Sequence, residues 1–305
     1  MTGQEPRRPA GKMHAGELDI DAALVRRLLA AQFPQWAELP LAPVPSAGTD
    51  NALYRLGAEL AVRLPRIQEA TAQVEKEQRW LARLAPQLPL AIPVPLALGA
   101  PSAGYPWPWS VYRWLDGENA TRERLADPAQ AATELAGFLA ALRRIDPGGG
   151  PSPGAHNSFR GAPLARRDAS VREAIVALRG MLDAEAVTAV WEAALQAPEW
   201  GDPPVWIHGD LLPGNLLVVA GRLSAVIDFG CLGVGDPACD LMSAWALFSG
   251  ESREAFRAQL AVDDASWARG RGWALSWALI FIPYYLETNP TGVRAAWHTL
   301  AEVLA

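Results

Sequence analysis

The sequence contains few lysine, cysteine and histidine residues, and each shortage excludes a class of site. Lys12 and Lys76 are the only lysines, so arginine supplies the rest of the 27 basic side chains. The two cysteines and four histidines lack the spacing of a zinc site or a disulfide framework. Positive charge is also not in excess, because the formal net charge is −6. This balance argues against sequence-independent binding of nucleic acid.

Long apolar runs are missing as well. The longest uncharged apolar stretch, residues 272–286, is too short to cross a bilayer and is typical of a buried helix. The first residues have no apolar stretch after their charges, so they do not resemble a secretory signal. We therefore expect a cytoplasmic protein without membrane contacts. A length of 305 residues is enough for about two domains.

Strand patterns dominate the first part of the chain. Gly57 and Ala58 separate two short apolar runs, which predicts a hairpin with a tight turn. Apolar residues at near-helical spacing among charges predict a helix over residues 69–84. The strands expected here cover residues 53–56, 60–64, 94–98 and 109–115.

Helical patterns follow after Gly117, interrupted by a segment rich in glycine and proline at residues 147–163. Strands followed by helices indicate an α+β architecture rather than alternating βαβ units. The helices expected cover residues 128–145, 168–196 and 238–304. We expect an N-terminal extension (1–20), a small β-rich N-terminal lobe (21–116) and a larger, mainly helical C-terminal lobe (117–305).

The segment 205–229 combines apolar strands with polar side chains. Asn215 precedes one expected strand, and Asp228 follows the next. If these two strands pair through a turn at Ala220-Gly221, their outer ends lie side by side, so Asn215 and Asp228 meet. Asp210, five residues before Asn215, then joins the same cluster.

These residue types suit phosphoryl transfer. In that reaction a carboxylate accepts the proton of the attacking hydroxyl, while an amide and a second carboxylate hold magnesium against the nucleotide phosphates. The order Asp, Asn and then Asp-Phe-Gly matches the kinase pattern. Alone, His-Gly-Asp (208–210) would be an ordinary turn, and Asp-Phe-Gly (228–230) would be an ordinary strand cap. Together they favour the catalytic interpretation.

The motifs HGDLLPGN (208–215) and VIDFG (226–230) resemble those of the aminoglycoside phosphotransferase family, small-molecule kinases with a protein-kinase-like bilobal fold. The resemblance implies that Asp210 is the catalytic base and that Asn215 and Asp228 bind Mg²⁺. It further implies that His208 braces the catalytic loop. In GVGDPACDL (233–241) it implies two structural partners of that loop, Asp236 and Asp240.

The resemblance extends back to a hairpin that covers the nucleotide, where backbone N–H groups from Ser46 to Asn51 would lie over phosphates. Many relatives carry a lysine on the second strand of this hairpin, whereas this chain has Arg63. Arginine is a permanent cation that binds phosphate oxygens bidentately. Glu77 matches the helix position that pairs with this cation, and a solvated surface glutamate is the alternative.

The segment WSVYRWL (109–115) resembles the last strand of the small lobe running into a hinge. A purine ring would meet the backbone there, between Tyr112 and Trp114. Recognition through the backbone leaves ATP and GTP as equal candidates for the co-substrate.

We therefore expect magnesium-dependent transfer of a γ-phosphate onto a hydroxyl of a small molecule. An aminoglycoside is the first candidate acceptor, since the net charge of −6 permits an acidic cleft. Thirteen tryptophans could also line an apolar cleft, which would suit a macrolide. An amino alcohol or a sugar-like compound is a further alternative acceptor. A non-catalytic nucleotide-binding module is the alternative from another class. The candidate acceptor-binding residues are Asn157, Arg160, Tyr284 and Glu287.

Overall fold

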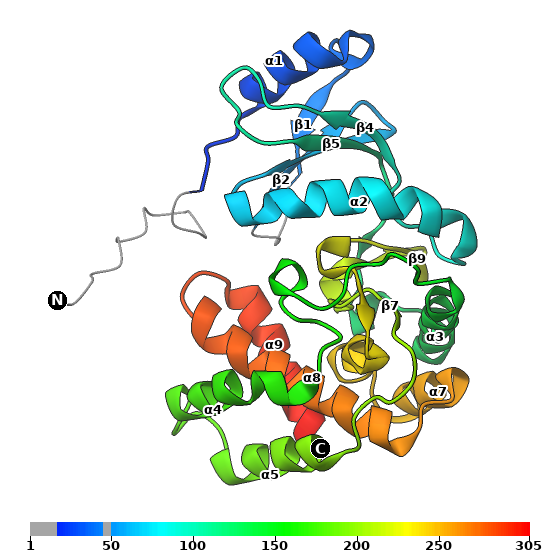
Figure 1. The fold of residues 1–305 in the computed structure, drawn as a ribbon, viewed down its shortest axis with the longest axis vertical. Coiled ribbons are helices and arrows are strands. Elements are labelled where there is room, and N and C mark those ends of the chain that lie inside the picture. The colour runs from blue at the N-terminus through cyan, green and yellow to red at the C-terminus, as the bar shows by residue number, and fades with distance from the viewer. Residues whose placement is uncertain (1–16, 45–49) are drawn as a thin grey trace, which may run out of the picture. The chain divides into compact units, whose positions relative to one another are not determined.

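The computed structural model describes residues 17–44 and 50–305 (Figure 1). By contacts between residues it divides into two compact units. Unit 1 comprises the described residues up to Ala85 together with Pro93–Leu115, and unit 2 comprises Pro86–Ile92 and Asp116–Ala305. Most of the expected N-terminal extension lies outside the described residues.

Unit 1 is built on a five-stranded antiparallel sheet in the order β1-β2-β3-β5-β4. The predicted hairpin is confirmed, with Gly57 at φ +61° in its turn. Glycine is favoured there because other side chains rarely adopt a positive φ. The strands are β1 (Leu41–Pro43), β2 (Asn51–Leu56), β3 (Leu60–Pro65), β4 (Pro95–Gly99) and β5 (Trp109–Arg113).

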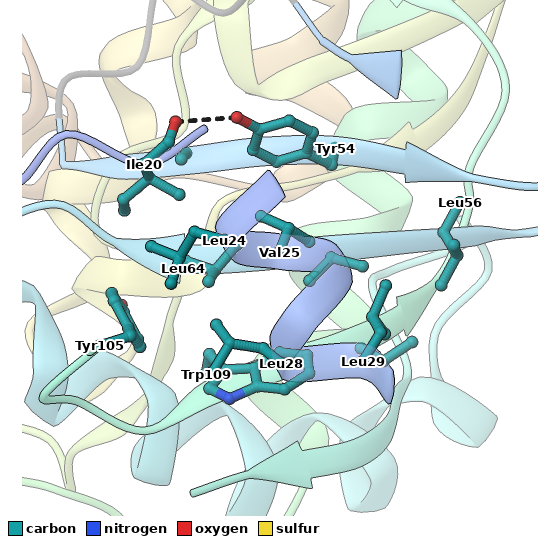
Figure 2. Close-up of a cluster of buried hydrophobic side chains, with 13 residues drawn as sticks. Ile20, Leu24, Val25, Leu28, Leu29, Tyr54, Leu56, Leu64, Tyr105 and Trp109 are labelled. Carbon is teal, nitrogen blue, oxygen red and sulfur yellow. Dashed lines mark hydrogen bonds between the residues drawn. The ribbon is translucent and has the colours of Figure 1, made fainter. Parts of the chain in front are cut away.

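Two helices pack against this sheet. Leu24, Leu28 and Leu29 of α1 (Ala22–Gln32) join a buried cluster with side chains of β2, β3 and β5 (Figure 2). That cluster takes Val62 and Leu64 from β3, while Arg63 between them bonds to the second helix, α2 (Thr71–Leu84). Successive strand residues point to opposite faces, so α1 and α2 cover opposite faces of the sheet.

Unit 2 is mainly helical, as the sequence predicts. The expected helical stretch over 168–196 is two helices, because a turn with Gly180 at φ +86° breaks it and Asp183 caps the second helix. The apolar stretch at 272–286 lies within a long, largely buried helix, α8. The helices are α3 (Pro128–Arg144), α4 (Asp168–Ala177), α5 (Ala184–Gln196), α6 (Ser243–Ala246), α7 (Gly250–Leu260), α8 (Asp264–Tyr285) and α9 (Pro290–Leu304).

Two small sheets in unit 2 carry the segment with the kinase-like motifs. The expected pairing of β8 with β9 is confirmed, and Ala220 and Gly221 both have positive φ in the turn. A further pairing, of β7 with β10, has no counterpart in the predicted elements. The strands are β6 (Glu118–Asn119), β7 (Val205–Ile207), β8 (Leu216–Val219), β9 (Arg222–Val226) and β10 (Gly233–Gly235).

In the described part of the chain, each helix is too short or too polar to extend through a lipid bilayer.

Candidate functional site

The loop from His208 to Asn215 joins β7 to β8 and carries the central carboxylate, Asp210. The Asn215 side-chain amide donates from Nδ2 to the Asp210 backbone carbonyl at 2.8 Å and to the Asp210 Oδ2 at 3.1 Å. The Asp210 side chain keeps 27% of its surface exposed. Asn215 therefore orients a carboxylate that remains accessible to a ligand.

Asp228 follows β9 and joins this cluster through the backbone. The Ile227 N–H donates to the Asn215 carbonyl at 2.8 Å, which ties the end of β9 to the start of β8. Asp228 itself has φ +62°, in the left-handed region that non-glycine residues seldom occupy. Strained backbone of this kind often accompanies functional sites. The convergence of Asp210, Asn215 and Asp228 thus follows from the β8–β9 pairing.

His208 is fully buried, and both of its ring nitrogens are engaged. The Asp210 N–H donates to Nδ1 at 3.2 Å, so the ring proton is on Nε2, which donates to the Ile227 carbonyl at 3.0 Å. The ring also packs against Phe229, with the ring centroids 4.6 Å apart. His208 therefore links the Asp210 loop to the residues around Asp228, which suits a bracing role.

Of the two carboxylates expected to support this loop, Asp240 bonds to it directly, whereas Asp236 bonds to other segments. Asp240 is fully buried and accepts from the His208 N–H at 2.9 Å and from the Gly209 N–H at 2.7 Å. Burial raises the pKa of the Asp240 carboxyl, and these bonds and the nearby His208 oppose that rise. Asp236 caps the following turn and forms a buried ion pair with Arg269 Nε at 2.8 Å.

The electrostatics of Asp210 combine opposing effects. Burial raises the pKa of its carboxyl most strongly, and the negative charge of Asp228 raises it further. Arg160 and His208 act in the opposite direction and lower it. The net rise favours proton acceptance by Asp210.

The donor set around Asp228 fits magnesium. Asn215 uses its amide nitrogen on Asp210, so its amide oxygen is the atom suited to a cation. Together with the Asp228 carboxylate it supplies two hard oxygen donors. Mg²⁺ is commonly held by one or two protein carboxylates or amides together with nucleotide phosphates, rather than by a complete protein cage. Within residues 17–44 and 50–305, no group of three His, Cys, Asp or Glu side chains is arranged to hold a metal by itself.

In unit 1, the structure brings Arg63 and Glu77 together. Arg63 Nη1 lies 2.6 Å from Glu77 Oε1, and the Glu77 side chain is only 2% exposed. The hydroxyl of Tyr112 donates to the other oxygen, Glu77 Oε2. Burial, followed by the charge of Glu77, raises the pKa of Tyr112 well above its ordinary value. Glu77 is therefore a buried anchor for both side chains, in contrast to a solvated glutamate.

The other residues predicted for the nucleotide site are Ser46, Asn51 and Trp114. Ser46 lies outside the described residues, and Asn51 is the first residue of β2, opposite Pro65 in β3. Trp114 lies beneath the Arg55 guanidinium, 4.7 Å from the ring centroid. The backbone N–H of Trp114 donates to the Glu59 carbonyl, so it already takes part in a hydrogen bond within unit 1.

The four candidate acceptor-binding residues fall into two pairs. Asn157 and Arg160 are buried, and Arg160 contacts Asp210. Tyr284 and Glu287 are exposed at the end of α8. Tyr284 is about 16 Å along the helix axis from Trp273, the α8 residue that contacts Arg160.

Two features of the site were not predicted from the sequence. One is the bond of Arg160 to Asp210 in the loop 208–215, which joins residues 50 positions apart. The other is the Asp236–Arg269 pair, whose only sequence signal is an arginine inside a largely apolar helical pattern. Neither contact follows from helical or strand periodicity, because each depends on tertiary packing.

Comparisons with known proteins agree with the motifs. A family model described as the phosphotransferase enzyme family matches residues 42–273. The GDP complex of wild-type aminoglycoside 2'-phosphotransferase-IIIa has a TM-score of 0.72 at 19% identity, covering 93% of this chain and 99% of that chain. The streptomycin-ATP-APH(2")-IIa ternary complex has a TM-score of 0.59 at 20% identity, with coverages of 86% and 90%.

A macrolide 2'-phosphotransferase from Brachybacterium faecium, MphH, has a TM-score of 0.58 at 22% identity, covering 91% of this chain and 97% of that chain. No curated protein matches the chain in sequence. The structural likenesses show a shared α+β fold, as the sequence predicted. Since the family model matches well over half of its residues, the chain belongs to the phosphotransferase enzyme family.

Proposed function

We propose that this phosphotransferase moves the γ-phosphate of a nucleoside triphosphate onto a hydroxyl of a small molecule, with Mg²⁺ as its metal. The observation that supports this most is the Asp210, Asn215 and Asp228 cluster, held by the bonds from Asn215 to Asp210 and from Ile227 to Asn215. A base, an amide oxygen and a second carboxylate are the groups that phosphoryl transfer requires.

In this proposal Asp210 accepts the proton of the acceptor hydroxyl. Asn215 holds the Asp210 carboxylate at Oδ2 and, with Asp228, provides the oxygen ligands of the metal. Bound Mg²⁺ would neutralise charge on the nucleotide phosphates. His208 and Asp240 keep the loop in place and take no part in proton transfer.

Arg63 is proposed as the cation for the α- and β-phosphates. Its bond to the buried Glu77 fixes the guanidinium, and 18% of the Arg63 side chain remains exposed. A planar guanidinium matches the geometry of phosphate oxygens and binds them bidentately. Asn51 and the Tyr112–Trp114 segment stay predictions for the nucleotide site, as does Ser46, which lies outside the described residues.

The relatives support the choice of co-substrate and acceptor. Their structures are described as complexes with GDP, or with ATP and streptomycin, and one relative is a macrolide 2'-phosphotransferase. We propose an antibiotic of the aminoglycoside type as the first acceptor to test, with macrolides, amino alcohols and sugar-like compounds as alternatives. A need for nucleoside triphosphate also supports a cytoplasmic location.

The test is a screen of these four acceptor classes with ATP and with GTP, in Mg²⁺ or in EDTA. Product is detected as transfer of labelled γ-phosphate. We expect transfer to at least one acceptor in Mg²⁺, its loss in EDTA and its loss in Asp210→Asn. Asp202→Asn, which changes an exposed carboxylate in unit 2, is the matched control and should behave as the unaltered protein. Tight nucleotide binding without any turnover would instead support the non-catalytic module.

A further inference from the structure

Arg160 contacts the catalytic loop although it belongs to a distant stretch of chain, the glycine- and proline-rich segment between α3 and α4. Its Nε donates to the Gly209 carbonyl at 2.7 Å, and its Nη2 lies 3.5 Å from Asp210 Oδ1. The residue is only 7% exposed. Its remaining nitrogen, Nη1, is buried and has no hydrogen-bond partner in the described part of the chain.

The backbone around Arg160 is strained in a way that fixes this position. Ser158 and Phe159 have φ values of 50° and 55°, and Gly161 has φ +80°. Two of these are non-glycine residues in the left-handed region, which needs support from surrounding structure. Asn157 gives that support, because it accepts from the Gly154 N–H at 3.0 Å and donates to the Arg160 carbonyl at 3.1 Å.

The two oxygens of Asp210 are held from different sides. Asn215, a proposed metal ligand, donates to Oδ2, whereas Arg160 lies at Oδ1. The 3.5 Å separation is longer than the roughly 2.7–2.9 Å of a firm charge-assisted bond. The guanidinium is therefore fixed by Gly209 but only loosely bound to the carboxylate, so it can also serve an incoming oxyanion.

The charge around Arg160 also favours an anion. Arg160 and Arg167 both lie over the Trp273 ring, with guanidinium carbons 5.5 Å and 5.0 Å from its centroid. The Arg167 Nε donates to the Ser276 hydroxyl, and Arg167 has no carboxylate partner among the described residues. Burial, and then the charge of Arg160, lowers the pKa of Arg167 to about 9. Two guanidinium groups thus lie on one indole ring, and among the described residues only Arg160 has a carboxylate partner, Asp210.

We propose that Arg160 binds the phosphoryl group during its transfer, with Nη1 donating to a phosphoryl oxygen while Nε and Nη2 hold Gly209 and Asp210. This inference rests on the proposed function. In the step, the acceptor oxygen forms the new bond to the γ-phosphorus, and the bond from that phosphorus to the β–γ bridging oxygen breaks. The electron pair leaves with the nucleoside diphosphate, and the hydroxyl proton goes to Asp210. Charge on the phosphoryl oxygens in this loose transition state is what a fixed guanidinium stabilises.

The test compares Arg160→Met and Arg160→Lys with Arg166→Met, which removes an exposed arginine that stacks on Phe159. Steady-state kinetics are measured with MgATP, using water, the best neutral acceptor of the screen and an acceptor that carries an acidic group. We expect Arg160→Met to lower kcat by about 100-fold or more, as loss of a transition-state donor does, while the KM for ATP changes less than about threefold. Arg160→Lys should recover part of this loss, and Arg166→Met should stay within about twofold of the unaltered enzyme.

A second measurement does not need turnover. Inorganic phosphate is titrated into the protein in the presence of MgADP, and its affinity is measured by calorimetry. We expect the affinity to fall about tenfold or more in Arg160→Met and to stay unchanged in Arg166→Met. Should Arg160→Met fail to fold, as thermal unfolding would reveal, Arg160→Lys takes its place with a smaller expected loss.

Several results would overturn the inference. They are equal phosphate affinity in the Arg160 and Arg166 variants, a raised KM for ATP with unchanged kcat, or an effect confined to acceptors that carry an acidic group. The last result would move the bound anion from the phosphoryl group to the acceptor. If the unaltered protein turns over no nucleotide at all, the proposed function fails, and the phosphate titration still decides whether Arg160 binds an oxyanion.

Discussion

Arg63 is the residue that replaces the expected lysine, and its surroundings suit an arginine. Glu77 accepts from Arg63 with one carboxylate oxygen and from the Tyr112 hydroxyl with the other. The guanidinium is thereby held in one orientation, and its planar fork of N–H donors matches phosphate geometry, which the single ammonium of a lysine would not reproduce.

Replacing Arg63 should therefore weaken nucleotide use even when the charge is kept. We expect Arg63→Ala to raise the KM for ATP about tenfold or more and to lower kcat, because the phosphate cation is lost. Arg63→Lys should give a smaller rise in KM. Arg79→Ala, an exposed arginine on α2, is the control. Unchanged kinetics of Arg63→Ala would remove this residue from the nucleotide site.

Arg167 is expected to lower the stability of the folded protein in a way that depends on pH. The folded-state pKa, about 9, is well below the ordinary value for arginine, because burial disfavours the charged form, so Arg167 departs from the permanent charge of an exposed arginine. Between these values the unfolded chain holds more protons than the folded chain, so the free energy of unfolding rises with pH there. At pH 7 the full destabilisation is present. Arg167→Met should therefore unfold at a higher temperature at pH 7, with a gain in unfolding free energy of at least about 1.4 kcal/mol, the value of one pKa unit.

Thermal and urea unfolding at pH 7 and at pH 10 measure this effect. The advantage of Arg167→Met should shrink at the higher pH, where the unaltered protein has partly lost the proton. Arg166→Met, on the neighbouring exposed residue, should show neither the gain nor the pH dependence. A gain that is the same at both pH values would show that the charge of Arg167 is not its cause.

Among the elements, the loop from His208 to Asn215 depends on the close approach of other backbone segments. Gly209 has φ +83°, and a Cβ atom there would lie 2.6 Å from the Cys231 carbonyl and 3.1 Å from the Arg160 Cβ. Gly214, in the same loop, has nothing within 4 Å of an added Cβ. A side chain would therefore clash at position 209 but not at position 214, and the sequence alone does not reveal this difference.

We expect Gly209→Ala to lower the free energy of unfolding by about 2 kcal/mol or more, because both the positive φ and the contact with Cys231 oppose a side chain. Gly214→Ala should stay within about 0.5 kcal/mol of the unaltered protein. Urea unfolding of the two variants gives this comparison. Equal stabilities would mean that the loop relaxes away from Cys231 at little cost.

Some of these elements can be predicted from the sequence, and others cannot. The β8–β9 hairpin was predictable because two apolar runs flank a two-residue turn, and this pairing alone joins Asn215 to Asp228. The strand β10 was not, because Gly-Val-Gly has no strand pattern. The contact of Arg160 with Asp210 could not be predicted, since it depends on the strained backbone at Ser158 and Phe159.

At the scale of the whole molecule, the α+β class could be predicted because strand patterns precede helical ones, and the family could be predicted from two local motifs. We assign binding of the nucleotide phosphates to Arg63 in unit 1, and the base and the metal ligands to unit 2. The acceptor is harder to predict, because the residues that would contact it are scattered over the loop before α4 and the end of α8 and share no motif.

The measurement that tests this assignment most directly is a comparison of nucleotide binding and phosphoryl transfer in Asp210→Asn. Asparagine keeps the shape of the side chain but removes the proton-accepting carboxylate. We predict that MgATP binds within about threefold of the unaltered affinity, because Asp210 acts on the acceptor hydroxyl, while transfer of the γ-phosphate falls by at least about 100-fold. Transfer at an undiminished rate in Asp210→Asn would contradict the assignment of Asp210 as the catalytic base.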